Sequence, residues 1–106
     1  MSVPCVVFST VPSLECASKV ADALVAEHLA ACVGIVEGIR SVYFWKDEVC
    51  RDRETLLVIK TTEEVYPMME QRLKALHPYE VPEIVRLPVT GGWPPYLAWI
   101  GDCVNR

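Results

Sequence analysis

The sequence predicts an α+β protein in which helices and strands alternate along the chain. Its pattern of apolar residues and its composition support this prediction. In two segments apolar residues recur every three or four positions, as in helices, and in the segments around them the residues are β-branched or apolar and polar residues alternate, as in strands. Apolar residues make up 52% and charged residues 23% of the 106 positions, a composition typical of folded proteins. This length suits one hydrophobic core, so we expect a single domain over residues 1–106.

The chain should begin with a strand followed by a helix. Residues Val3 to Thr10 are mostly β-branched or apolar and are bounded by Pro4 and Pro12, which predicts a strand. Ser13 can then cap a helix in which apolar residues recur at helical spacing as far as Leu29.

A long hairpin is predicted next. From Cys32 to Trp45 the apolar period shortens to two, with glycines at 34 and 38 as bends. Arg53 to Thr61 forms the returning strand after a turn at residues 46–48. Strands of roughly 14 residues span on the order of 45 Å, whereas a compact chain of this size has a diameter of about 33 Å. The arm that carries residues 42–45 should therefore project onto a neighbouring molecule.

The second half should hold another helix and another strand. A helix is predicted from Glu63 to Leu76, with Pro67 tolerated in its first turn. Prolines mark the segment from Pro82 to Val89 as an edge strand. The sequence GGWPP is a loop, and residues 96–104 form a short C-terminal element whose type the pattern leaves open.

This order of elements, βαββαβ, is that of ferredoxin-like proteins, in which both helices cover one face of an antiparallel sheet. The other face should then be polar, with clean alternation along each strand. In residues 5–8 and 56–59, however, both alternating sets of side chains are apolar. Because the chain has no helix left to cover a second apolar face, we expect a second copy of the protein to cover it.

Charge, hydropathy and cysteine content argue against several classes. The net charge of −4 and the lack of a Lys/Arg cluster argue against nucleic-acid binding. No run of roughly 18 apolar residues is present to span a membrane, and the start MSVPCVVFSTVP lacks the basic region of a signal peptide, so we expect a cytoplasmic protein. The five cysteines include no C-x-x-C pair, which argues against a disulfide framework. Cys50, in a turn beside charged residues, is the best candidate for an exposed thiol.

The segment HPYEVPEIVRLPV, residues 77–89, permits two interpretations. In the first it is a structural corner: Pro78 ends the preceding helix, and His77 lies at the negative end of that helix, where a protonated imidazole is favoured. In the second it forms part of a ligand cleft at a subunit boundary. Glu80 and Glu83 share this cleft only if Pro82 kinks the strand. The expected cleft residues are His77, Tyr79, Glu80, Glu83, Trp45 and Lys60.

Four motifs carry a family resemblance: LAACVGIVEGIRSVYFWKDEV, LLVIKT, HPYEVPEIVRLPV and the closing YLAWI. In order and spacing they resemble the CutA family of divalent-cation tolerance proteins, over about residues 3–100. The resemblance implies a ferredoxin-like protomer and a PII-like homotrimer built around the long hairpin. It also implies an association with tolerance to copper and other divalent ions.

The copper site of that family is only partly present in this sequence. In its copper-binding members a cysteine lies in the first strand, and two adjacent histidines precede the Pro-Tyr pair. Here Ser9 and Leu76 occupy two of these positions, and only His77 matches. A hydroxyl and an alkyl group cannot replace a thiolate and an imidazole as copper ligands. We therefore expect His77 to bind a divalent ion weakly, with no obligatory cofactor.

The sequence holds no G-x-G-x-x-G, phosphate-loop or H-E-x-x-H pattern, and we do not expect an enzyme. Two functions stay open. The first is a homotrimeric, PII-like binding module in divalent metal ion (copper) homeostasis, which holds a metal ion or small ligand at subunit clefts. The second is a very stable trimeric scaffold or signalling adaptor that binds a partner protein and no specific metal.

Overall fold

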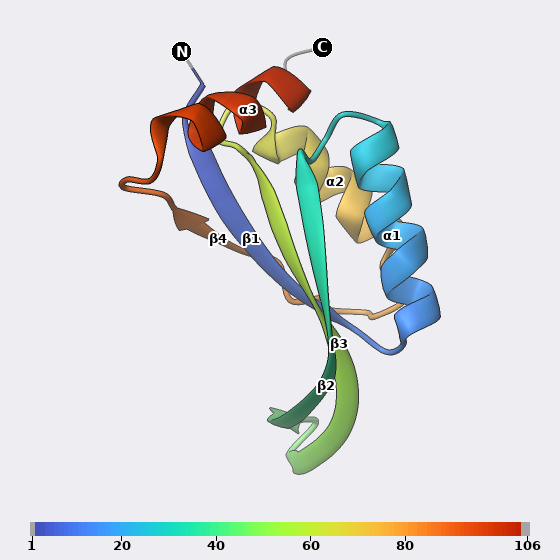
Figure 1. The fold of residues 1–106 in the computed structure, drawn as a ribbon. Coiled ribbons are helices and arrows are strands. Elements are labelled where there is room, and N and C mark those ends of the chain that lie inside the picture. The colour runs from blue at the N-terminus through green and yellow to red at the C-terminus, as the bar shows by residue number, and fades with distance from the viewer. Residues whose placement is uncertain (1, 105–106) are drawn as a thin grey trace.

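The computed structural model describes residues 2–104, which form one four-stranded sheet and three helices (Figure 1). The sheet has the strand order β2-β3-β1-β4, and every neighbouring pair is antiparallel. The predicted ferredoxin-like arrangement is therefore confirmed, with a third helix at its end. In chain order the elements are β1 (Pro4–Val11), α1 (Leu14–Ala26), β2 (Cys32–Trp45), β3 (Glu48–Thr62), α2 (Tyr66–Leu76), β4 (Val85–Pro88) and α3 (Pro94–Val104).

Local sequence signals explain where α1 and α2 begin and end. The hydroxyl of Ser13 caps α1 by accepting a hydrogen bond from the N–H of Cys16 at 3.1 Å. After α1, His28 takes a left-handed φ of 59° that ends the helical path. Pro67 lies in the first turn of α2, as expected. His77 closes α2 in an extended conformation, because the proline that follows disfavours helical geometry there.

The main hydrophobic core lies between the sheet and the helices α1 and α2, which cover the same face (Figure 1). The side chains of α1 and α2 that face the sheet follow the helical spacing seen in the sequence. Those of β1 and β3 alternate along each strand. The core includes Ala17, Val20, Leu24, Met69, Leu73, Val7, Val11, Leu57 and Ile59.

The C-terminal element, whose type the sequence left open, is the helix α3. Its residues Ile100 and Val104 pack with Ala31 in a second, smaller cluster. Val6 of β1 and Lys60 of β3 are register partners on the sheet face opposite α1 and α2, and both lie beside the start of α3. The expectation that no helix is left for this second face is therefore partly wrong, since α3 covers one end of it.

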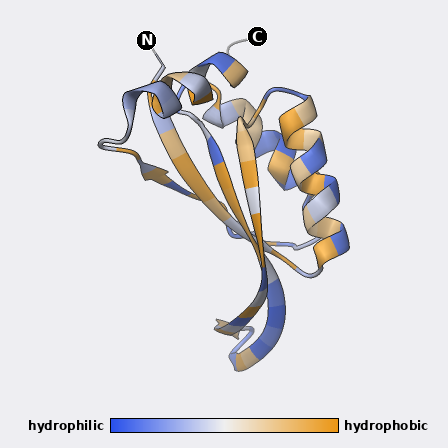
Figure 2. Ribbon diagram, viewed as in Figure 1, coloured by the Kyte–Doolittle hydropathy of each residue, from blue (hydrophilic) through white to orange (hydrophobic). Residues whose placement is uncertain are grey.

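The rest of the second face is apolar and uncovered in the single chain. Register partners point to the same side of a sheet, so Val85, Phe8 and Val58 form one row of this face. Leu56 and Val36 belong to the next row toward the hairpin. Figure 2 shows apolar residues along these strands, and the outer ones, Val85 and Val36, are exposed. The apolar second face expected from the sequence thus persists in the folded chain.

The hairpin of β2 and β3 projects from the body of the protein (Figure 1). The longest dimension of the chain is 44 Å, against 25 and 22 Å in the other two directions, as the expected strand length requires. The returning strand begins at Glu48, earlier than the predicted Arg53, because it pairs with β2 as far as Trp45. Lys46 and Asp47 form a tight two-residue turn, with φ values of 49° and 65°.

The five cysteines are all free thiols, of which Cys5 is buried and the other four are partly buried. Burial is the largest cause that raises the pKa of Cys5 to about 11. Cys50 is partly buried rather than exposed as predicted, and its Sγ donates a weak hydrogen bond at 3.8 Å to the carbonyl oxygen of Glu48, two residues earlier on β3.

Candidate functional site

The corner after α2 is held by the imidazole of His77, which is 7% exposed. Its Nε2 lies 2.9 Å from the carbonyl oxygen of Thr10, and its Nδ1 accepts a hydrogen bond from the backbone N–H of Tyr79 at 3.2 Å. This pair of bonds requires a neutral ring with its hydrogen on Nε2. Burial lowers the pKa of His77, and the smaller effects of the Thr10 hydrogen bond and of Glu54 oppose this. The protonated imidazole expected from the sequence is therefore wrong at neutral pH.

Two tyrosines near this corner donate hydrogen bonds to carboxylates of β3. The hydroxyl of Tyr79 donates to Glu54 Oε2 at 2.8 Å, and the hydroxyl of Tyr43 donates to Asp52 Oδ2. The bond to Asp52 raises the pKa of Tyr43 to about 12. Burial, followed by the bond to Glu54, raises the pKa of Tyr79 well above its usual range. Both phenols therefore stay protonated at neutral pH and act as donors.

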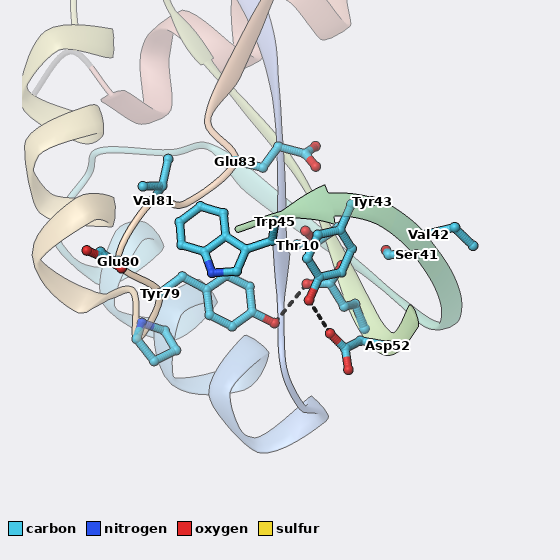
Figure 3. Close-up of a pocket in the computed structure, with 12 residues that line it drawn as sticks. Thr10, Ser41, Val42, Tyr43, Trp45, Asp52, Tyr79, Glu80, Val81 and Glu83 are labelled. Carbon is cyan, nitrogen blue, oxygen red and sulfur yellow. Dashed lines mark hydrogen bonds between the residues drawn. The ribbon is translucent and has the colours of Figure 1, made fainter. Parts of the chain in front are cut away.

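These hydrogen bonds, dashed in Figure 3, border a cavity of about 630 Å³ between the hairpin and the segment that follows α2. We call it the acidic cavity. One wall comes from the hairpin and the other from residues 78–83. Its lining combines four carboxylates with three aromatic rings: Asp52, Glu54, Glu80, Glu83, Tyr43, Trp45 and Tyr79.

The acidic cavity carries unbalanced negative charge. The ion pairs in the described part of the chain involve Glu15, Glu27 and Glu63, and none of the four cavity carboxylates takes part in one. Glu54 is 8% exposed, and its hydrogen-bond donor is a neutral hydroxyl, that of Tyr79. A buried carboxylate without a cation is energetically unfavourable. The cavity should therefore attract a cation.

The structure brings together four of the six predicted cleft residues, namely Trp45, Tyr79, Glu80 and Glu83. The two glutamates share one cavity because residues 77–84 are not in strand conformation, as the expected kink at Pro82 required. These four residues already meet within one chain, and completion of the cleft by a neighbouring subunit stays a prediction. His77 is not part of the lining and instead contacts the ring of Tyr79 in a tilted arrangement, with centroids 4.8 Å apart and the ring planes at 50°.

Lys60 is the predicted cleft residue that the structure places elsewhere. It lies six positions after Glu54 on β3, or roughly 20 Å along the strand, and lines a second cavity with Trp93 and Tyr96. Within a single chain, its grouping with Glu80 is therefore wrong. The sequence pattern indicates which residues share a strand face, but not which part of that face meets a given loop.

Sequence reasoning missed Tyr43, Asp52 and Glu54. Asp52 and Glu54 are two positions apart on β3, so their side chains point to the same side of the hairpin. The register places Ser41 opposite Asp52, which brings Tyr43 close to the same carboxylate. The alternating charges of RDRE, residues 51–54, are the signal that could have found these residues.

The acidic cavity does not fit a tightly bound metal ion. Among residues 2–104, no three His, Cys, Asp or Glu side chains are placed to hold one ion, whereas copper prefers soft or imidazole ligands and calcium takes several oxygens. At the positions of the family's copper site, the Ser9 hydroxyl is buried without a hydrogen-bond partner. Both ring nitrogens of His77 are already bonded. One chain therefore offers electrostatic attraction rather than a coordination sphere.

The fold and the cavity define a class of protein: a ferredoxin-like α+β domain with a projecting hairpin and a cavity lined by carboxylates and aromatic rings. The family model described as CutA1 divalent ion tolerance protein matches residues 5–103, and the chain belongs to this family. The resemblance seen in the sequence is thereby confirmed. Among residues 2–104, no helix is long and apolar enough to cross a membrane.

Relatives from distant organisms share the family. The divalent-cation tolerance protein CutA of Thermus thermophilus is 55% identical over 97 residues, which cover 92% of this chain and 94% of that protein. A solved structure of the Thermus protein aligns with a TM-score of 0.91 and 52% identity, covering 93% of this chain and 96% of that one. CutA from Xylella fastidiosa aligns with a TM-score of 0.94 and 39% identity, covering 97% and 99%. The chloroplastic CutA of Arabidopsis thaliana is 47% identical over 101 residues, which cover 95% of this chain but 56% of that protein.

Proposed function

We propose that this protein is a homotrimeric, PII-like binding protein in divalent metal ion (copper) tolerance, which attracts cations weakly at the acidic cavity. The observation that supports this most is the set of four carboxylates that have no ion-pair partner among residues 2–104. The family description connects the chain to divalent ion tolerance. Its relatives are named for this tolerance and not for a reaction, so we expect a binding role rather than catalysis.

Trimer formation is supported by the apolar surfaces of the hairpin and of the second sheet face. Phe44 near the tip is 69% exposed, and Val42 and Val49 beside it are exposed as well. Clustered apolar side chains on a surface are typical of protein interfaces, and a closed ring of identical subunits would cover them. The number three comes from the family resemblance. Light scattering after gel filtration should give about three times the chain mass of 11.9 kDa, and a mass near that of one chain would contradict the proposal.

The proposed cation affinity is low. Because the carboxylates do not converge on one point, a divalent ion should stay largely hydrated, with a Kd on the order of 10⁻⁴ to 10⁻³ M, as in the weakest oxygen-ligand sites. The test is calorimetric titration of the parent protein with copper and with magnesium. The double variant Asp52→Asn/Glu80→Gln should weaken the binding of both ions. Its matched control, Glu15→Gln/Asp22→Asn on α1, removes the same charge away from the cavity and should bind as the parent does.

The variant His77→Gln separates the acidic cavity from the copper position of the family. If copper binds at His77, this variant loses copper affinity but keeps magnesium affinity. If the carboxylates bind both ions, the variant keeps both affinities. A stoichiometric nanomolar copper site in the parent protein would contradict weak binding. A lack of saturable binding across a panel of ions would instead favour the trimeric scaffold that binds a partner protein.

The names of the relatives place them in different compartments. The Arabidopsis protein is termed chloroplastic, and a relative from Archaeoglobus fulgidus, 33% identical to this chain, is termed periplasmic. For this chain we expect the cytoplasm, since all five cysteines are free thiols, as in proteins of reducing compartments. Fractionation of the source cells tests this expectation, and recovery outside the cytoplasm would contradict it.

A further inference from the structure

A second cavity, of about 410 Å³, lies where β1 and β3 meet the start of α3. It is on the sheet face opposite α1 and α2, at the end that α3 covers. Its walls are apolar side chains and the backbone of Gly91 and Gly92, and the only charged residue in its lining is Lys60. We call it the lysine cavity. Its volume lies at the lower end of the range for small-molecule sites, which is about 300 to 1,000 Å³.

Lys60 carries its positive charge into these apolar surroundings without a counterion among residues 2–104. Its ammonium nitrogen lies 5.5 Å from the ring centroid of Tyr96, and the interaction with that tyrosine raises the pKa of Lys60. The side chain is therefore charged at neutral pH. It forms no ion pair with any described residue, and a partly buried cation without an anion is unfavourable. An anion from solution would remove this imbalance.

The other walls favour a flat, apolar ligand. In the single chain, Trp93 is 73% exposed at the rim, where its indole ring can contact a ligand. Tyr96 is held in place by Trp99, with ring centroids 5.5 Å apart. Planar aromatic faces prefer offset or tilted contact with another aromatic ring. The first two residues of α3 are Pro94 and Pro95, which have no N–H to offer, and Lys60 is the one positively charged residue of the lining that would attract an anion.

We propose that the lysine cavity binds a small planar aromatic carboxylate, with its carboxylate at the Lys60 ammonium group and its ring against Tyr96 and Trp93. The charge and the shape of the cavity both select this class. A small inorganic anion would leave the apolar walls uncovered, and a neutral aromatic molecule would leave Lys60 without a partner. The inference does not depend on cation binding at the acidic cavity, which has the opposite charge and lies elsewhere on the chain.

The experiment compares three probes by NMR titration of the intact protein. Indole-3-acetate has both the ring and the charge, indole-3-acetamide keeps the ring without the charge, and acetate keeps the charge without the ring. A ligand of this size should bind with a Kd on the order of 0.1 to 1 mM. The indole N–H signal of Trp93 should shift on binding. Indole-3-acetamide should bind at least about tenfold more weakly than indole-3-acetate, as expected when a charged group loses its partner. Acetate should show no saturable binding.

Two variants locate the site. Lys60→Met keeps much of the apolar stem but removes the charge, and it should weaken indole-3-acetate binding at least about tenfold. Lys19→Met is the matched control, because Lys19 lies on α1 in an exposed pair with Glu15 at 3.5 Å, and it should bind as the parent does. Trp93→Ala removes an exposed ring without disturbing the core and should weaken binding several-fold, even if Lys60→Met proves unstable.

Three results would overturn the inference. The first is equal affinity for the acid and the amide. The second is unchanged binding in a folded Lys60→Met variant. The third is no saturable binding of indole-3-acetate by the parent protein at about ten times the expected Kd.

Discussion

His77 holds the turn after α2 through both of its ring nitrogens. A metal ion at either nitrogen would have to replace one of these hydrogen bonds, at Thr10 or at Tyr79. Because of this cost, we expect His77, which matches the copper position of the family, to bind copper with low affinity. At the scale of single residues, the same geometry makes His77 a pH-sensitive part of the fold.

The stability of the protein should fall in mild acid because of this imidazole. Burial lowers the pKa of His77 in the folded state, so below its ordinary value of about 6.5 the unfolded chain binds more protons than the folded one. The stabilising contribution is complete above that value and is lost as the pH falls through the lowered folded pKa. His77→Gln should therefore flatten the dependence of the unfolding free energy on pH between about pH 7 and pH 5.

Urea denaturation at several pH values measures this slope. His28→Asn is the control, since His28 is exposed and its left-handed φ of 59° suits asparagine. The slope should fall more in His77→Gln than in this variant. If His77→Gln keeps the slope of the parent, the imidazole does not have the proposed role.

The hydroxyl of Tyr79 should stabilise the fold through the buried carboxylate of Glu54. Tyr79→Phe removes the donor at 2.8 Å and leaves that carboxylate without it, which typically costs about 1–3 kcal/mol of unfolding free energy. Tyr66→Phe is the comparison, because the hydroxyl of Tyr66 donates to Glu70 in an exposed setting, where water can replace it. Equal losses in the two variants, measured by urea denaturation, would contradict this account.

At the scale of elements, the hairpin depends on one glycine. Gly38 has a φ of 81° and lies where the register between β2 and β3 shifts, between Val36 and Ile39. A side chain there would meet no atom within 4 Å, so any effect of substitution comes from backbone strain and not from a clash. This bulge bends the arm, and the bent arm forms one wall of the acidic cavity.

Gly38→Ala should lower the unfolding free energy by about 1–2 kcal/mol, the penalty of a left-handed conformation for a residue with a Cβ. Gly91→Ala is matched to it, because the space around Gly91 is equally open and its φ is not positive. That control should be neutral or stabilising by up to about 1 kcal/mol. Urea denaturation curves of the two variants test this prediction. Similar midpoints would show that a Cβ at position 38 does not strain the backbone of the bulge.

At the scale of the whole molecule, the exposed apolar surfaces predict assembly. Trp45 near the tip of the hairpin is 39% exposed in the single chain, although it lines the acidic cavity. In the proposed trimer the hairpin lies across a neighbour, and the remaining surface of this ring becomes buried. The acidic cavity would then lie next to a subunit boundary.

Trp45→Ala should weaken the trimer and lower the melting temperature far more than Trp93→Ala does. Truncating a buried aromatic anchor costs about 3–5 kcal/mol, and in a trimer the loss occurs in each subunit. Trp93 lies at the rim of the lysine cavity, so its removal should affect ligand binding more than stability. Sedimentation and thermal melts of the two variants test this. An intact trimer with the parent's melting point for Trp45→Ala would mean that the arm extends freely into solvent.

The parts of the structure that could be predicted from the sequence depend on local or periodic information. Residue types and their spacing predict the capping of α1 by Ser13, the end of α2 just before Pro78 and the extended hairpin. The strand boundaries that differ from the prediction are those set by pairing with a neighbouring strand. For example, β3 starts at Glu48 because Trp45 is opposite it, although the charged residues 51–54 do not look like part of a strand.

By itself the sequence determined the order of the elements, the antiparallel sheet with two apolar faces and the length of the hairpin. It also indicated that Trp45, Tyr79, Glu80 and Glu83 belong to a cleft. Only the tertiary structure decided that Asp52 and Glu54 join them, that Lys60 faces a different cavity, and that α3 covers the end of the second face. Tyr79 and Glu54 are 25 residues apart, so their hydrogen bond depends on the register of β3 and on the bend of the hairpin. Neither is encoded in local spacing, because both arise only when distant segments pack against each other.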